Sequence, residues 1–193
     1  AIDAQGRRLS ALHAVRLDAQ GDEVWSYARP SLRGLSVARG RQGDTLIVSN
    51  LPEASGETPA FELITLDADG KALGVERVEG LCAFATAVGL DGETIVVGRD
   101  ASQSFVVSSY DARGEELWSN SLRDAYHTCS ECKAVGTDAE GNVYVIGDAG
   151  LFGFAVGDDR IEGNGNSEVP SIFFLASFDR KGRGSWGRRF VLL

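Results

Sequence analysis

The sequence is poor in several kinds of residue, and each shortage excludes a class of protein. It has no apolar run of about 18 or more residues, the length that a membrane-spanning helix requires, so we expect no membrane insertion. Only 19 Lys and Arg stand against 28 Asp and Glu, and the net charge is -9. Nucleic acids and anionic lipid surfaces attract basic proteins, so we expect neither as a partner.

Methionine is absent, and the chain begins at Ala1. We therefore expect a processed product or an excised part of a longer protein. The remaining composition is ordinary for a globular protein, because 43% of the residues are hydrophobic and 24% are charged. No segment carries a long apolar stripe at the 3.6-residue helical period, which favours an all-β fold.

A short phrase recurs three times with a constant interval. The copies read "RQGDTLIV", "LDGETIVV" and "AEGNVYVI", and their glycines, Gly43, Gly92 and Gly141, are 49 residues apart. Each glycine is followed by a short, almost wholly apolar strand. Self-similarity at such an interval indicates an array of structural repeats.

A second phrase alternates with the first. Its copies are "LHAVRLDAQGDEVW", "FELITLDADGKALG", "FVVSSYDARGEELW" and "FFLASFDRKGRGSW". They share an Asp-x-x-Gly turn, which the third copy of the first phrase also contains, at Asp18 and Gly21, Asp67 and Gly70, Asp111 and Gly114, Asp138 and Gly141, and Asp179 and Gly182. Trp25, Trp118 and Trp186 stand four residues after the glycine, where the second copy has Gly74. The tryptophans are expected in the core or between repeats.

Turn chemistry converts these phrases into structure. An Asp at the first turn position accepts hydrogen bonds from backbone N–H groups further on, and Gly supplies the positive φ of a tight reversal. Each Asp-x-x-Gly is therefore predicted to be a hairpin tip. Two hairpins per repeat give four short strands in about 45 residues, the size of one β-propeller blade.

We therefore predict an all-β chain, a β-propeller of four-stranded antiparallel blades. A partial, degenerate blade is expected over residues 1–30, and full blades over 31–80, 81–124 and 125–193. The interpretation we favour is a part of a larger propeller, so that the partners include the remaining blades of a longer parent chain. A closed four-bladed ring is the alternative.

The repeats resemble those of the bacterial seven-bladed β-propeller (SBBP) repeat family. That family's pattern is similar to "D-x-x-G-N-V-Y-V-x-G" followed by "F-x-x-x-x-D-x-x-G-x-x-x-W", and this chain has "DAEGNVYVIGD" and "FFLASFDRKGRGSW". The resemblance covers almost the whole chain. It implies a secreted, periplasmic or cell-surface scaffold without cofactors, and it transfers no catalytic residues, because the matching positions are turn and packing residues.

The segment "YHTCSECK" gathers His127, Cys129 and Cys132. A Cys129–Cys132 disulfide or a pair of structural thiols is the main interpretation. A bridge from Cys82 to one of them, a metal site and a redox pair are the alternatives. A structural zinc site requires four ligands, and only three suitable residues are present.

The long connection "DAGLFGFAVGDDRIEGNGNSEVP" departs from the repeat. Asp158, Asp159 and Glu162 are candidate calcium ligands among glycines, although their spacing does not fit an EF-hand. A solvated loop without a ligand is the simpler interpretation. His13 lies in a predicted strand, where a packing or surface role is favoured over that of a base.

Two functions remain. The first is a non-catalytic scaffold or interaction module that binds a protein or a glycan through its blade-connecting loops. The second is an enzyme, either a propeller hydrolase or lyase with its site at the channel mouth, or a thiol redox protein using Cys129 and Cys132. The scaffold is favoured because the repeats account for nearly all recurrent residues and leave no convergent set of titratable groups.

Overall fold

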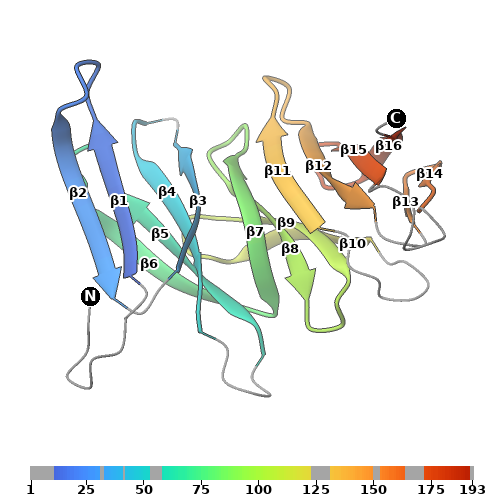
Figure 1. Cartoon of the computed structure of the whole chain (residues 1–193), viewed down its shortest axis with the longest axis horizontal. Coiled ribbons are helices and arrows are strands. Elements are labelled where there is room, and N and C mark those ends of the chain that lie inside the picture. The colour runs from blue at the N-terminus through green and yellow to red at the C-terminus, as the bar shows by residue number, and fades with distance from the viewer. Residues whose placement is uncertain are drawn as a thin grey trace.

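The structure is a computed structural model that describes residues 11–30, 33–40, 42–52, 58–122, 131–149, 153–163 and 172–191. These ranges contain sixteen strands and no helix, which confirms the predicted all-β class. The strands form antiparallel sheets that follow one another in chain order from left to right (Figure 1). None of the sheets in these ranges closes on itself.

The first sheet has two strands, β1 (Ala11–Leu17) and β2 (Glu23–Pro30). The second sheet has β3 (Arg33–Arg39), β4 (Thr45–Asn50), β5 (Ala60–Leu66) and β6 (Ala72–Glu79). The third has β7 (Leu81–Val88), β8 (Thr94–Asp100), β9 (Phe105–Tyr110) and β10 (Glu116–Leu122). The fourth has β11 (Glu131–Thr137), β12 (Val143–Ala149), β15 (Ile172–Phe178) and β16 (Gly184–Val191). Within each sheet, neighbours in the chain order just given are also neighbours in space.

All five Asp-x-x-Gly sequences form hairpin turns of one kind, as predicted. In the turn between β5 and β6, Gly70 has a φ of 80° and its N–H donates to the carbonyl of Asp67 (3.1 Å). The Oδ1 atom of Asp67 accepts hydrogen bonds from the N–H groups of Asp69 and Lys71, both at 2.9 Å. The carboxylate thus satisfies donors that the tight turn leaves free, while glycine adopts the left-handed conformation at no steric cost.

Two further turns reach the same geometry without the aspartate. Gly40 and Gly89 stand at the first position, and a carboxylate at the fifth position replaces the missing one. Asp44 accepts from the N–H of Gln42 at 3.2 Å, and Glu93 accepts from the N–H of Asp91 at 2.8 Å. A Cβ atom on Gly40 or Gly89 would collide with the side chain of Asp44 or Glu93, so a larger residue there would displace the carboxylate that accepts in the turn.

The first strands of the three four-stranded sheets lie side by side. The N–H of Thr86 in β7 donates to Oγ of Ser36 in β3 at 3.0 Å. On the other side of β7, Oγ1 of Thr137 in β11 donates to the carbonyl of Val88 at 2.7 Å. Neighbouring sheets are thus joined along β3, β7 and β11.

Apolar residues fill the spaces between the sheets. Val48 and Phe61 of the second sheet form one buried cluster with Ala83 and Val96 of the third. Because a sheet between two others buries both of its faces, β8 and β9 are almost continuously buried.

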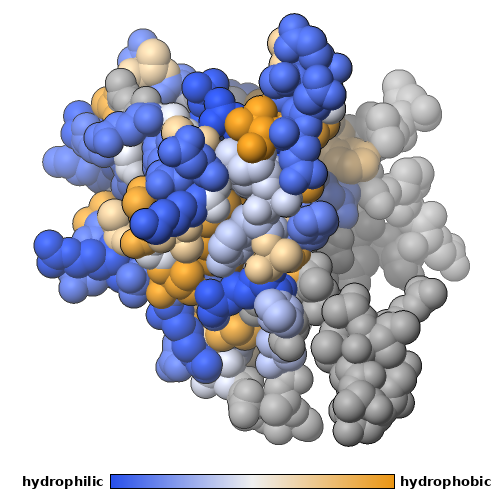
Figure 2. Space-filling model, turned by 90° about the vertical axis from the view of Figure 1, so that its left-hand side faces the viewer, coloured by the Kyte–Doolittle hydropathy of each residue, from blue (hydrophilic) through white to orange (hydrophobic). Residues whose placement is uncertain are grey.

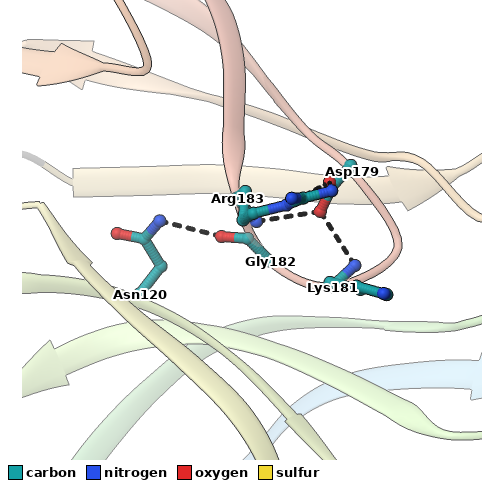
Figure 3. A network of polar contacts seen from close by, with 5 residues as sticks. All are labelled: Asn120, Asp179, Lys181, Gly182 and Arg183. Atoms are coloured by element: carbon teal, nitrogen blue, oxygen red, sulfur yellow. Dashed lines mark hydrogen bonds and ion pairs between the residues drawn. The ribbon is translucent and has the colours of Figure 1, made fainter.

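A third contact repeats between sheets at their outer turns. The ring of Trp25 in β2 packs on the turn of the second sheet so closely that a Cβ on Gly70 would lie 2.6 Å from it. Trp118 in β10 packs in the same way on Gly182, in the outer turn of the fourth sheet. Asn120 joins this contact by donating to the carbonyl of Gly182 at 2.8 Å (Figure 3). Trp25 and Trp118 are therefore packing residues between sheets.

The long connection after β12 contains a second, smaller hairpin, β13 (Phe154–Val156) and β14 (Asp159–Ile161). The expectation of a solvated loop is wrong for this part of the connection. Phe154 and Ile161 are 2% and 1% exposed, and they belong to the core cluster between the third and fourth sheets. The ring of Phe154 lies 4.8 Å from that of Phe174. The hairpin thus contributes to the core between these sheets.

Candidate interaction site

The first sheet corresponds to the outer half of the others. Its strands surround the turn Asp18–Gly21 and carry Trp25, just as β9 and β10 surround Asp111–Gly114 and carry Trp118. In the full sheets, the strand before this turn is bonded on both sides, as β9 is to β8 and β10. Among the described residues, β1 pairs only with β2. Within the described ranges, no strand pairs with the other edge of β1.

Beside this edge lies a groove of about 720 Å³ between β1 and the first two strands of the second sheet. β1 forms one wall, and Leu35 and Val37 of β3, with Thr45 and Ile47 of β4, form the opposite side. Exposed apolar side chains line it, since Leu35 is 41% and Val37 65% exposed. The groove occupies the position where the inner two strands of a full first sheet would lie.

Equivalent positions in the next sheet show what such strands do. Val37 pairs with Ile47 across the second sheet, and Thr86 occupies the same place opposite Val96 in the third. Thr86 is only 7% exposed, because β3 and β4 of the preceding sheet cover it. Val37 is exposed because its preceding sheet has only β1 and β2 in the described residues. The exposed surface at Val37 is thus the counterpart of a buried interface within the same chain.

The outward face of the first sheet is also partly apolar. Val15, Leu17 and Val24 are 44%, 57% and 52% exposed. Figure 2, which views this end of the molecule, shows apolar atoms interspersed with hydrophilic ones. Val15 and Leu17 also line the groove.

The opposite end of the array carries a second exposed apolar face. Ile146 and Phe190 of the fourth sheet are 42% and 51% exposed. Trp186, also in the fourth sheet, is half-buried, and its ring lies 6.2 Å from that of Tyr144. Trp25 and Trp118 each pack on the turn of the following sheet, but no described sheet follows Trp186.

The aspartates with perturbed pKa values are engaged in local structure. The Asn142 side chain donates to Asp138 Oδ2 at 2.8 Å and Tyr144 OH donates to it at 2.9 Å, and these bonds lower the pKa of Asp138. Burial disfavours the charge of Asp179, but hydrogen bonds from the backbone and guanidinium of Arg183 hold its pKa below the usual value. Each carboxylate thus stabilises its own turn.

Burial is the main cause of the shifted pKa values of Tyr110 and Cys132. Burial raises the pKa of Tyr110, which lies in the cluster between the second and third sheets. Burial also raises the pKa of Cys132 to about 12, and its thiol contacts the carbonyl of Ala134 at 3.4 Å. No two of these groups converge on a cleft, which is the arrangement that an acid–base site requires.

The predicted cysteine cluster is described only in part. Cys132 is buried in β11 and Cys82 half-buried in β7, and the two are not bonded to each other, which excludes a Cys82–Cys132 bridge but does not test a Cys82–Cys129 bridge. The Sγ atom of Cys82 lies 3.5 Å from the side-chain nitrogen of Asn50. Cys129 and His127 lie outside the described residues, so the Cys129–Cys132 disulfide stays a prediction.

The three candidate calcium ligands do not come together around one point. Asp159 accepts from the guanidinium of Arg188 at 2.8 Å and from the N–H of Gly187 at 3.1 Å, and these contacts lower its pKa. Glu162 forms an ion pair with Arg160 (3.2 Å), while Asp158 is exposed in the hairpin turn. In the part of the chain that the structure describes, no group of three or more His, Cys, Asp or Glu side chains is placed to hold a metal ion.

Sequence reasoning did not identify the groove. His13 was expected to have a packing or surface role, and it is exposed on β1 and lines the groove. A signal was present, because the first Asp-x-x-Gly unit is not preceded by a complete copy of the other phrase. In the part of the chain that the structure describes, β3 and β4 lack the preceding strands that cover β7 and β8.

No protein-family model matches the chain, and no curated protein matches it in sequence. Among solved structures, 41 chains match. One of them is a protein of unknown function from Bacteroides caccae, with a TM-score of 0.54 and 14% sequence identity, over 92% of this chain and 75% of that one. The likeness concerns the fold alone. The described residues contain no helix long and apolar enough to cross a membrane.

Proposed function

We propose that this chain is a non-catalytic scaffold that binds a protein partner, and that its four-stranded sheets are blades of a β-propeller. The alignment of β3, β7 and β11 supports the propeller, because the first strand of each propeller blade lies nearest the central axis. The blades would cover 31–80, 81–124 and 125–193, with the outer half of another in 1–30.

The observation that carries the binding function is the apolar groove beside β1. Its Val37 side chain is 65% exposed, and contiguous exposed apolar surface in a concave site is typical of interaction sites. An apolar lining favours a protein ligand over a glycan, which requires more polar groups for its hydroxyls. This site replaces the blade-connecting loops as our principal candidate, because residues 123–130 and 164–171 lie outside the described ranges.

The roles of the repeated residues support a scaffold. The Asp and Gly residues of the repeats form turns, and Trp25 and Trp118 join neighbouring sheets. The resemblance to the bacterial propeller repeats supports a secreted or envelope-associated setting. Such a protein would need a stable fold with an accessible ligand site and no reacting groups.

The function is tested by probing immobilised glycans and extended peptides with the labelled chain, alongside turnover assays with chromogenic glycosides, esters and a model disulfide. We expect a peptide ligand and no turnover. Turnover that disappears in His13→Ala or Cys132→Ser would contradict the proposal and support an enzyme. Leu73→Lys is the matched control for a lysine placed in the groove at Val37, since Leu73 is 64% exposed and lies outside the groove.

A further inference from the structure

We propose that a pocket between the third and fourth sheets binds a small organic cation, an alkylamine that carries one or two ammonium groups. The pocket has a volume of about 290 Å³ and shares no residue with the groove beside β1. The site therefore goes beyond the proposed function and is independent of it.

The pocket lies at the hairpin turns of the two sheets. The turn between β7 and β8, the turn between β9 and β10 and part of β10 line it, and Arg180 contributes from the turn between β15 and β16. The Nη2 atom of Arg180 lies 3.4 Å from Oδ2 of Asp91, which links the two sheets. Both side chains are more than half exposed, so the pocket is accessible from solvent.

A buried hydroxyl group without a partner faces this pocket. Ser109 of β9 lies directly opposite Trp118 of β10, and both residues line the pocket. Phe105 and Val107, at alternate positions before Ser109, belong to the core between the third and fourth sheets, so Ser109 points to the same side. Ser109 is 0% exposed, yet its Oγ atom has no hydrogen-bond partner among the described residues. Such a group costs free energy, and a ligand atom that bonds it recovers that cost.

The lining of the pocket is acidic. The three carboxylates of Asp91, Glu93 and Asp111 and the one guanidinium of Arg180 give it a formal charge of -2. Glu93 accepts from the N–H of Asp91, and Asp111 accepts from the N–H of Arg113, both at 2.8 Å. The turns thus hold these two carboxylates in place beside the pocket. A negative pocket favours a cation over a neutral or anionic ligand of the same size.

The rest of the lining favours an organic cation over a metal ion. In the part of the chain that the structure describes, no three His, Cys, Asp or Glu side chains meet at a point that could hold a metal. The pocket is also lined by Leu90, Leu117 and Trp118. An alkylamine matches both kinds of lining, because its ammonium groups bond oxygen atoms and its methylene groups pack on apolar side chains. The face of an indole ring attracts ammonium groups as well.

The test is an amide-resolved NMR titration of the whole chain with putrescine, an alkyl diamine. Butanediol of the same chain length is the control ligand, because hydroxyl groups replace its ammonium groups. Ser109→Ala removes the unpartnered hydroxyl, and Asp91→Asn removes one charge from the lining. Asp69→Asn is the matched control for Asp91→Asn, since Asp69 is equally classed as exposed, has the same position in another hairpin turn and lies outside the pocket.

We expect putrescine to shift the amide resonances of residues 90–93 and 109–118 saturably, and butanediol to leave them unchanged. Ser109→Ala should weaken the affinity about fivefold, the value of a hydrogen bond to a charged group. Asp91→Asn should weaken it about threefold, since this carboxylate is exposed. Asp69→Asn should bind like the wild type. Thermal unfolding separates loss of binding from loss of fold, because removal of an unsatisfied hydroxyl in Ser109→Ala should not destabilise the chain.

Absence of saturable shifts at up to about 10 mM putrescine would overturn the inference. Equal shifts from butanediol would also overturn it, because the pocket would then select hydroxyl groups and not charge. Shifts spread over the whole surface, or equal losses of affinity in Asp91→Asn and Asp69→Asn, would show unspecific attraction to the net charge of -9 and contradict a defined site. Unchanged affinity in Ser109→Ala would contradict it as well.

Discussion

The indole Nε1 of Trp25 donates a hydrogen bond of 3.1 Å to the carbonyl oxygen of Ala68, in the outer turn of the next sheet. The ring also lies against Gly70 of that turn. Trp118 occupies the same place over Gly182. Trp25 and Trp118 thus each pack on the turn glycine of a following sheet.

Substitutions of Gly70 and Gly21 distinguish the contribution of the tryptophan contact from that of backbone strain. Both have positive φ, 80° and 91°, but nothing lies within 4 Å of a Cβ placed on Gly21. We expect Gly21→Ala to lower the free energy of unfolding by about 1 kcal/mol, the cost of a left-handed alanine. Gly70→Ala should cost roughly 2 kcal/mol more, because its Cβ overlaps Trp25. Urea denaturation measures both, and equal losses would contradict the contact.

Gln103 occupies the glycine position of the turn between β8 and β9 with a φ of 66°. Its N–H donates to the carbonyl of Asp100, as the turn glycines do in theirs. We expect Gln103→Gly to raise the free energy of unfolding by about 0.5 to 1 kcal/mol, since relief of strain exceeds the entropy that glycine adds to the unfolded chain.

Ala101→Gly is the control for that variant, because Ala101 lies in the same turn without positive φ. It should lower the stability by about 0.5 kcal/mol through chain entropy alone. Thermal and urea unfolding of both variants gives the signs, and a loss of stability in Gln103→Gly would refute the strained turn.

Asp138 predicts a pH dependence. Its pKa is lowered in the folded protein, chiefly by the hydrogen bond from the Asn142 side chain. Its contribution is therefore complete above the unfolded pKa of about 3.9 and is lost as the pH falls through the folded value. We expect the difference in unfolding free energy between wild type and Asp138→Asn to be constant from about pH 7 to 5 and to shrink below about pH 4. A difference that is as large at pH 3 as at pH 7 would disagree with this sign.

Cys132 should resist alkylation in the folded chain. The thiolate is the reactive form, and a thiol with a pKa of about 12 is ionised in only about one molecule in ten thousand at pH 8. After reduction, iodoacetamide should modify half-buried Cys82 before Cys132, and mass spectrometry of the digested protein reads both. Rapid modification of Cys132 would show that β11 does not bury it. The same experiment without reduction detects the predicted disulfide with Cys129.

The hairpin turns and the strands beside them could be predicted from the sequence because their determinants are local. Asp67 and Gly70 stabilise a turn by contacts within five residues, and this pattern survives wherever the two residues recur. The role of the tryptophans was predictable from their constant distance to the turn. The turn at Asp100 was missed, since Gln103 gives no sign of a positive φ.

The insert hairpin and the groove depend on less visible features. Gly157 and Asp158, between alternating apolar residues, carry the signal of a two-residue hairpin, but the acidic residues nearby suggested a calcium loop instead. The groove could not be predicted, because it arises where no strand among the described residues covers Val37. Whether an apolar residue such as Val37 is buried depends on the sheet that packs against its strand, and the local sequence does not contain that information.

Amide hydrogen exchange of the free chain tests the central claim most directly, because the binding site exists only if β1 has a free edge. Residues 60–66 and 105–110 are bonded to strands on both sides, whereas the described residues pair β1 with β2 alone. We predict that about half of the amides in residues 11–17 exchange far faster than those of β5 and β9, since an antiparallel strand paired on one side leaves alternate N–H groups free. Uniform protection of β1, equal to that of β5, would mean that its edge is already paired and would contradict the account.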